Sequence, residues 1–185
     1  LRWRPLEFHE MLKLVDAAST DRVLRYLMIL IGCACRPSAA LELEGCQIDR
    51  QAGTINLLRP GKEQNNKYRP TIRLPSFIDA IYHEHNLCSQ AKVRLNEKKP
   101  MDSIKSSWLT TRRIAGLDNL VNPYSVRHTI ARWLRGCGVE AWHTSSQMGH
   151  KRKGSEITEL YAPNDPKYLS EALEAIEGYF ALLYS

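Results

Sequence analysis

The longest apolar run in the chain covers residues 26–35. Thr20 is a good N-cap in front of it, so we predict a helix over residues 21–34 that ends before Arg36 and Pro37. Ten apolar residues are too few to span a bilayer, which needs about 20 in a helix. This helix must therefore be covered by the rest of the chain, and we expect a core built around it.

Composition limits what else the chain can be. With 185 residues, of which 43% are hydrophobic, it can bury one sizeable core, so we expect one domain. The net charge is +6, with Lys and Arg spread along the whole length. That balance favours a polyanionic partner, either nucleic acid or an anionic membrane surface, with a merely basic soluble protein as the alternative.

The cysteines indicate the redox environment. There are five, an odd number without a paired C-x-x-C. This pattern argues against a disulfide framework or a structural zinc site and favours a reducing cytoplasm. Cys33 and Cys35 lie in the apolar run, so we expect both in the core.

Capping residues and apolar periodicity predict a mainly helical α+β fold with a small antiparallel sheet. The expected helices cover residues 5–18, 21–34, a short segment ending at 43, 76–91, 103–115, 123–136, 139–148, a short segment carrying Tyr161, and about 166–184. The expected strands cover residues 47–49, 54–58 and 68–74, the last two joined as a hairpin across the turn-rich residues 61–66.

Two of these helices have clear apolar stripes. Asn122 caps the first and Pro123 opens it, and its stripe consists of Val126, Ile130, Trp133, Leu134 and Cys137. The stripe of the final helix consists of Leu169, Leu173, Ile176, Phe180 and Leu183. This final helix either packs on its own domain or docks on a neighbouring protomer.

Several side chains could grip a phosphodiester. Arg127 flanks an apolar stripe, and Arg36 ends a very apolar helix, where a charged group is costly unless it has a partner. Two such arginines could bind one phosphate by bidentate hydrogen bonds. Lys62, His150 and Tyr161 each have an ordinary explanation when taken singly, as an exposed turn residue, a structural histidine and a core tyrosine.

Taken together, five segments in order resemble the catalytic domain of the tyrosine recombinases, the phage integrase family. Residues 35–43 resemble its G-x-R-x-x-E-x-x-x-L box, with Ala39 in place of the Glu and Ala34 or Cys35 in place of the Gly. Gly61-Lys62 resembles the lysine turn, and the next strand follows it. Residues 124–129 match H-x-x-R-H-T with Tyr124 where His is usual. Met148-Gly149-His150 matches L-G-H, and Tyr161 follows 11 residues after His150.

The resemblance implies a mechanism. Arg36 and Arg127 would bind the scissile phosphate, and His150 would hydrogen-bond to it. Tyr161 would attack the phosphorus to form a 3′-phosphotyrosyl intermediate, and Lys62 would protonate the departing 5′-oxygen. The position of Tyr124 would assist removal of the proton from the nucleophile. Neither ATP nor metal would be required, because the tyrosyl link conserves the phosphodiester energy.

The implied partner is double-stranded DNA, bound by a homotetramer, with a monomer as the alternative for the isolated domain, and no membrane is implied. The chain begins where the family's catalytic domain begins, so we expect a fragment of a longer cytoplasmic protein, prokaryotic or phage-derived, without its N-terminal DNA-binding domain. A phenol has a pKa of about 10, so Tyr124 is a poorer proton acceptor than imidazole but can still donate a hydrogen bond. Two alternatives therefore stay open, a type IB topoisomerase-like enzyme and a DNA-binding module that has lost cleavage.

Overall fold

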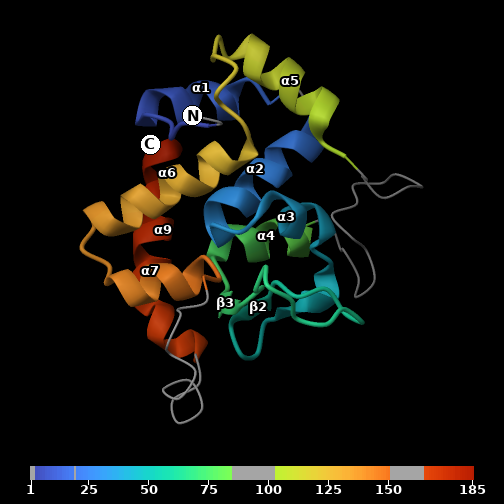
Figure 1. The fold of residues 1–185 in the computed structure, drawn as a ribbon, viewed down its shortest axis with the longest axis vertical. Coiled ribbons are helices and arrows are strands. Elements are labelled where there is room, and N and C mark those ends of the chain that lie inside the picture. The colour runs from blue at the N-terminus through green and yellow to red at the C-terminus, as the bar shows by residue number, and fades with distance from the viewer. Residues whose placement is uncertain (1–2, 19, 85–102, 151–164) are drawn as a thin grey trace.

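The structure is a computed structural model that describes residues 3–18, 20–84, 103–150 and 165–185. Helices and strands follow the predicted order and differ mainly at their ends (Figure 1). The helical elements are α1 (Phe8–Asp16), α2 (Asp21–Cys33), α3 (Pro37–Glu42), η1 (Gly45–Gln47), α4 (Ser76–Glu84), α5 (Lys105–Ile114), α6 (Pro123–Gly136), α7 (Ala141–Gln147), η2 (Pro166–Leu169) and α9 (Ser170–Leu183). The strands are β1 (Ile48–Asp49), β2 (Thr54–Asn56) and β3 (Thr71–Arg73). The predicted mainly helical fold with a small antiparallel sheet is confirmed.

Helix α2 lies at the centre of the core, as the apolar run predicted. It packs against α3, α4, α6 and α9 (Figure 1). Its side chains from residue 26 to residue 33 are all buried, and those of Leu27 and Ile31 are fully inaccessible to solvent. Thr20 caps the helix by accepting a hydrogen bond from the Val23 amide. Cys33 is also buried, as expected, and so is Cys35.

The sheet has the order β1-β2-β3, and both pairs are antiparallel. Ile55 pairs with Ile48 on one side and Ile72 on the other, and the side chains of Ile55 and Ile72 are fully buried. The hairpin strands are shorter than predicted. The Leu57 amide still donates to the Pro70 carbonyl at 3.0 Å, but proline has no amide hydrogen with which to continue the ladder.

Helix α6 confirms its predicted start. The Asn122 side chain accepts from the Tyr124 amide at 2.9 Å, and Pro123 occupies the first turn. The predicted stripe is wrong at its end, because Cys137 is exposed. The helix ends at Gly136, so Cys137 no longer continues the helical period.

Helix α9 packs against α2 and α6 of its own domain. Its buried face consists of Ala172, Ile176, Tyr179 and Leu183. Leu169, Ile176 and Leu183 of the predicted stripe are buried, and Leu173 and Phe180 lie half-buried at the edges of this face. Phe180 stacks on Phe77 of α4, with the ring centroids 3.8 Å apart.

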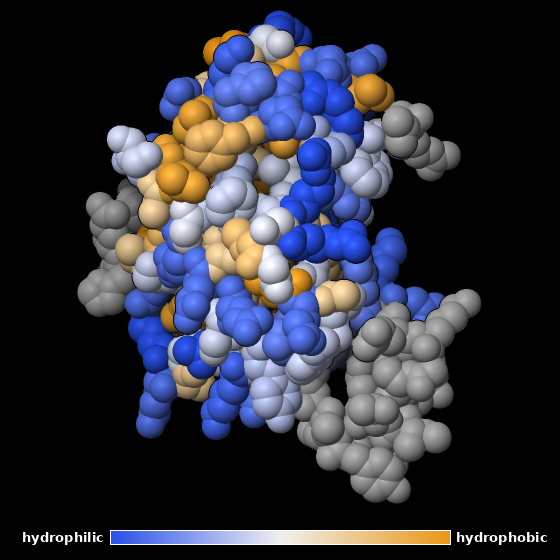
Figure 2. All heavy atoms as spheres, turned by 90° about the vertical axis from the view of Figure 1, so that its left-hand side faces the viewer, coloured by the Kyte–Doolittle hydropathy of each residue, from blue (hydrophilic) through white to orange (hydrophobic). Residues whose placement is uncertain are grey.

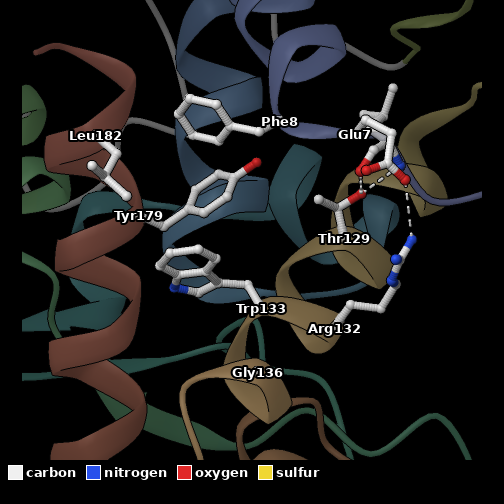
Figure 3. A pocket seen from close by; sticks show the side chains of 9 residues that line it. Glu7, Phe8, Thr129, Arg132, Trp133, Gly136, Tyr179 and Leu182 are labelled. Atoms are coloured by element: carbon white, nitrogen blue, oxygen red, sulfur yellow. Dashed lines mark hydrogen bonds and ion pairs between the residues drawn. The ribbon is translucent and has the colours of Figure 1, made fainter.

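A pocket of about 340 Å³ lies between the segment before α1, helix α6 and helix α9. Tyr179 lies between Phe8 and Trp133, and each neighbouring ring meets it edge to face (Figure 3). Thr129 accepts a hydrogen bond from the Leu6 amide at 2.7 Å and so joins the N-terminal segment to α6. The face of the molecule toward the left of Figure 1 carries hydrophobic surface among hydrophilic side chains (Figure 2). Within the described ranges, no helix has both the length and the apolar character needed to cross a membrane.

Candidate active site

Arg127 is the buried charge at the centre of the candidate site. It projects from α6 with only 3% of its surface exposed. Its Nη1 donates to the Ala34 carbonyl and its Nη2 to the Met148 carbonyl, both at 2.7 Å. Burial lowers the pKa of Arg127 to about 10, so the guanidinium stays charged at neutral pH. One side chain thus joins the ends of α2 and α7 to α6.

Arg36 lies beside it and is bound to the same turn. It is the N-cap residue of α3 and is half-buried. Its Nη1 donates to the Tyr68 carbonyl at 2.6 Å and its Nη2 to the Gly149 carbonyl at 3.2 Å. Burial lowers the pKa of Arg36. The structure therefore brings together the two arginines that the sequence singled out, on the consecutive carbonyls of Met148 and Gly149.

The turn after α7 explains why glycine precedes His150. The Gly149 amide donates to the Ser146 carbonyl at 3.0 Å and the His150 amide to the Ser145 carbonyl at 2.9 Å. These two bonds form a Schellman motif, which requires a left-handed residue at the position of Gly149. Gly149 has a φ of +65°. The motif ends the helix and directs His150 toward the arginines.

His150 contacts Arg127 through its ring, with the Arg127 Nη2 at 3.1 Å from the His150 Nε2. A guanidinium can only donate, so Nε2 must accept, and the ring is then neutral with its proton on Nδ1. Burial, and then the charges of Arg127 and Arg36, lower the pKa of His150. The imidazole is therefore neutral at pH 7.

The Gly149→Ala substitution should be strongly destabilising. A Cβ there would lie 2.6 Å from both the Tyr68 carbonyl oxygen and the Pro70 Cδ. The left-handed backbone adds about 1–2 kcal/mol of strain and the overlap about 1–3 kcal/mol. We expect the free energy of unfolding, measured in urea, to fall by about 2–5 kcal/mol.

Gly138→Ala is the matched control. Gly138 also has a positive φ, +82°, but a Cβ there meets no atom within 4 Å. Only the strain of about 1–2 kcal/mol should remain. Equal losses in the two variants would show that the approach of Gly149 to the Tyr68–Pro70 segment is not tight.

Lys62 is presented by a tight turn, as its place after Gly61 suggested. The Lys62 amide donates to the Arg59 carbonyl at 3.1 Å, and Gly61 has a φ of +76°. Pro60 and Gly61 are the residues that a type II turn favours at its two central positions. The Lys62 Nζ donates to Glu42 at 3.0 Å. In this structure the ammonium is bound to that carboxylate at the end of α3, not to the site formed by the arginines.

Tyr124 lies on the first turn of α6 and is 45% exposed. Its phenol is within electrostatic range of the guanidinium groups of both Arg36 and Arg127. His128, which follows Arg127 in the sequence, stacks on Trp3 with the ring centroids 3.5 Å apart. Tyr124 therefore lies on the solvent side of the site, whereas the ring of His128 packs against Trp3.

The resemblance to the integrase family is tested independently by a family model. The model of the phage integrase family matches residues 4–167. The chain belongs to the phage integrase family. Among curated proteins, none matches the sequence.

Two solved structures are similar to this integrase-family chain. The integrase from mycobacterium phage Brujita is 15% identical with a TM-score of 0.62, covering 94% of this chain and 57% of that one. The XerA recombinase is 18% identical with a TM-score of 0.61, covering 91% of this chain and 63% of that one. At these identities the likeness shows the fold, and the chain spans less than two thirds of either relative.

Of the residues matched to the integrase-family boxes, the structure describes Ala34 but not Tyr161. Ala34 has a φ of +47°, the conformation that favours glycine, so it is Ala34 and not Cys35 that takes the place of the Gly in the first box. Tyr161, the predicted nucleophile, lies outside the described residues. So do the basic residues 151–153.

Two residues next to the predicted site residues of this integrase-family chain, Arg69 and Glu42, were not singled out from the sequence. Arg69 lies within electrostatic range of Arg36, and its Nη1 donates to Glu42 at 2.6 Å. Glu42 therefore contacts both Arg69 and Lys62. A carboxylate three residues after Ala39 on the same helix was the available signal, since residues at i and i+3 share one face.

Proposed function

We propose that the chain is the catalytic domain of a site-specific DNA recombinase or integrase that cleaves and rejoins DNA through a 3′-phosphotyrosyl intermediate on Tyr161. The observation that carries the proposal is the convergence of Arg36, Arg127 and His150 on one turn, Met148-Gly149. Membership of the phage integrase family supports it, and so does the formal net charge of +6.

The two arginines would stabilise the transition state. Each guanidinium has five N–H donors, more than its carbonyl bonds use, so donors remain for the non-bridging oxygens of a phosphate. The carbonyl bonds of Arg36 and Arg127 hold both groups in place before DNA arrives. Preorganised donors of this kind stabilise the charge that develops on the phosphorane oxygens without reorganisation.

The bond changes balance without a further reactant. The Tyr161 oxygen forms a bond to phosphorus while the bond from phosphorus to the 5′-oxygen breaks. The phenolic proton passes to solvent water, a step that the position of Tyr124 would assist. The Nε2 of His150 accepts from Arg127, so its Nδ1–H would donate a hydrogen bond to the phosphate. Lys62 gives a proton to the 5′-oxygen. Rejoining reverses these steps with a 5′-hydroxyl as the nucleophile.

A nicked suicide duplex carrying the recombination site tests the proposal with the full-length protein. Cleavage near the nick releases a short strand, so the covalent complex accumulates. We expect an adduct that survives SDS, and peptide mapping should place the DNA on the peptide that contains Tyr161. Absence of any adduct would leave a DNA-binding module without cleavage, and relaxation of supercoiled plasmid without site preference would indicate a topoisomerase.

Replacing Tyr124 by phenylalanine tests whether its hydroxyl takes part. We expect the hydroxyl to donate a hydrogen bond to the phosphate, and a hydrogen bond to a charged group is worth about 1.5–3 kcal/mol. Single-turnover cleavage should slow by about 10- to 100-fold, whereas Tyr124→His, the residue usual at this position, should retain activity. A Tyr124→Phe variant as fast as wild type would show that the phenol has no part in the chemistry.

A further inference from the structure

Glu42 joins the two halves of the candidate site. Its Oε2 accepts from the Lys62 Nζ at 3.0 Å and from the Arg69 Nη1 at 2.6 Å. Glu42 is the last residue of α3, the short helix that Arg36 caps at its other end. The carboxylate therefore connects the helix that begins at one predicted catalytic residue to the loop that carries another.

The loop itself is closed around Arg69. The Gln64 side chain accepts from the Arg69 amide at 3.0 Å and donates to the Arg69 carbonyl at 2.6 Å. The Pro60-Gly61 turn orders the backbone of Lys62. The Lys62 side chain, 45% exposed, remains the flexible part, and a lysine loses rotamer entropy when it is held in one place.

The electrostatics favour a charged Glu42. Burial alone would raise the pKa of Glu42, but the hydrogen bonds from Arg69 and Lys62 outweigh burial and lower it. Arg69 is the more deeply placed of the two partners, with 14% of its side chain exposed. It can therefore hold the carboxylate when Lys62 moves to another acceptor.

We infer that Glu42 is a positioning residue for Lys62: it keeps the ammonium beside the site, and Lys62 exchanges Glu42 for the 5′-oxygen of the scissile phosphodiester during cleavage. The inference rests on the proposed function, in which Lys62 is the general acid. Arg69 retains Glu42 during that exchange, so the ammonium can return once the leaving group has been protonated. A surface ion pair without such a role would contribute little to stability.

The test uses two nicked suicide duplexes that differ in one atom. One has the natural 5′-oxygen at the scissile bond and the other a bridging 5′-sulfur. A thiol has a pKa of about 8.5, so a sulfur leaving group needs no general acid. Single-turnover cleavage is measured with saturating full-length protein, for wild type, Glu42→Gln and Lys62→Ala.

We expect Glu42→Gln to slow cleavage of the oxygen substrate by about tenfold, part of the roughly 10²- to 10⁴-fold that a general acid contributes. On the sulfur substrate it should match wild type. Lys62→Ala should show the same pattern with a larger loss, and the double variant should be no slower than Lys62→Ala alone. Asp79→Asn is the matched control. Asp79, on α4, also forms an ion pair, at 2.6 Å with Arg50, and its variant should behave like wild type on both substrates.

Three results would overturn the inference while leaving the proposed function intact. Glu42→Gln could cleave the oxygen substrate as fast as wild type, which would show that Glu42 does not position Lys62. It could cleave faster than wild type, which would mark Glu42 as a restraint on Lys62. It could also be equally slow on both substrates, which would mark a purely structural role. Absence of an adduct from wild type on both duplexes would overturn the proposed function, and this inference with it.

Discussion

The Tyr161→Phe substitution should abolish the covalent protein–DNA adduct. Phenylalanine keeps the ring but removes the oxygen that would bond to phosphorus, and loss of the nucleophile from an active site reduces turnover by on the order of 10⁴-fold or more. The measurement is adduct formation on the nicked suicide duplex, resolved in SDS. DNA affinity at moderate salt should be unchanged, because the arginines proposed to bind the phosphate remain.

Tyr168→Phe is the control for this experiment. Tyr168 lies seven residues beyond Tyr161 on η2 and is 49% exposed, so it is an accessible phenol in a nearby segment. It should form the adduct at the wild-type rate. If the adduct persisted in Tyr161→Phe and disappeared in Tyr168→Phe, the nucleophile would be Tyr168, and the proposal would name the wrong residue.

The Arg127→Lys substitution should have the second largest effect. A lysine keeps the charge, but its compact ammonium cannot reproduce the planar fork that reaches the Ala34 and Met148 carbonyls. We expect single-turnover cleavage to slow by about 10²- to 10³-fold, the usual cost of one preorganised donor in a transition state. A buried carbonyl left without its donor costs about 1–3 kcal/mol of unfolding free energy, which urea denaturation would detect.

Arg132→Lys is the control that shows whether any arginine-to-lysine change on α6 has the same effect. Arg132 is on the same helix, but its side chain is 61% exposed and lies 3.6 Å from Glu7 in a surface ion pair (Figure 3). Neither cleavage nor stability should change measurably, since such pairs contribute about 0–1 kcal/mol. If Arg127→Lys were equally harmless, the buried guanidinium would have no special role in phosphate binding.

Local signals predicted most of the helices because each signal acts over one turn of backbone. The Thr20 and Asn122 caps began α2 and α6 at the expected residues. Predictions failed where a distant surface decides. The buried face of α9 includes Tyr179, which the predicted stripe did not contain, because the rings of Trp133 and Phe8 lie around that position.

In the candidate site, too, the sequence selected residues by type and order but did not indicate their long-range contacts. The residue types and their order in the sequence were enough to select Arg36, Arg127 and His150, and the structure brings these three together at the Met148-Gly149 turn. Lys62 was also selected, but nothing local indicated that its ammonium would bind Glu42, which lies 20 residues earlier in the chain.

The sequence by itself therefore determined the family, the helical core around α2, and the turns that present Lys62 and His150. These depend on capping, on periodicity and on the left-handed backbone that glycine allows, all of which are properties of neighbouring residues. Only the tertiary structure decided which carbonyls hold the two arginines and that Glu42 lies between Lys62 and Arg69. Those contacts join segments far apart in the chain, and a side-chain pairing across such distances leaves no periodic trace in the sequence.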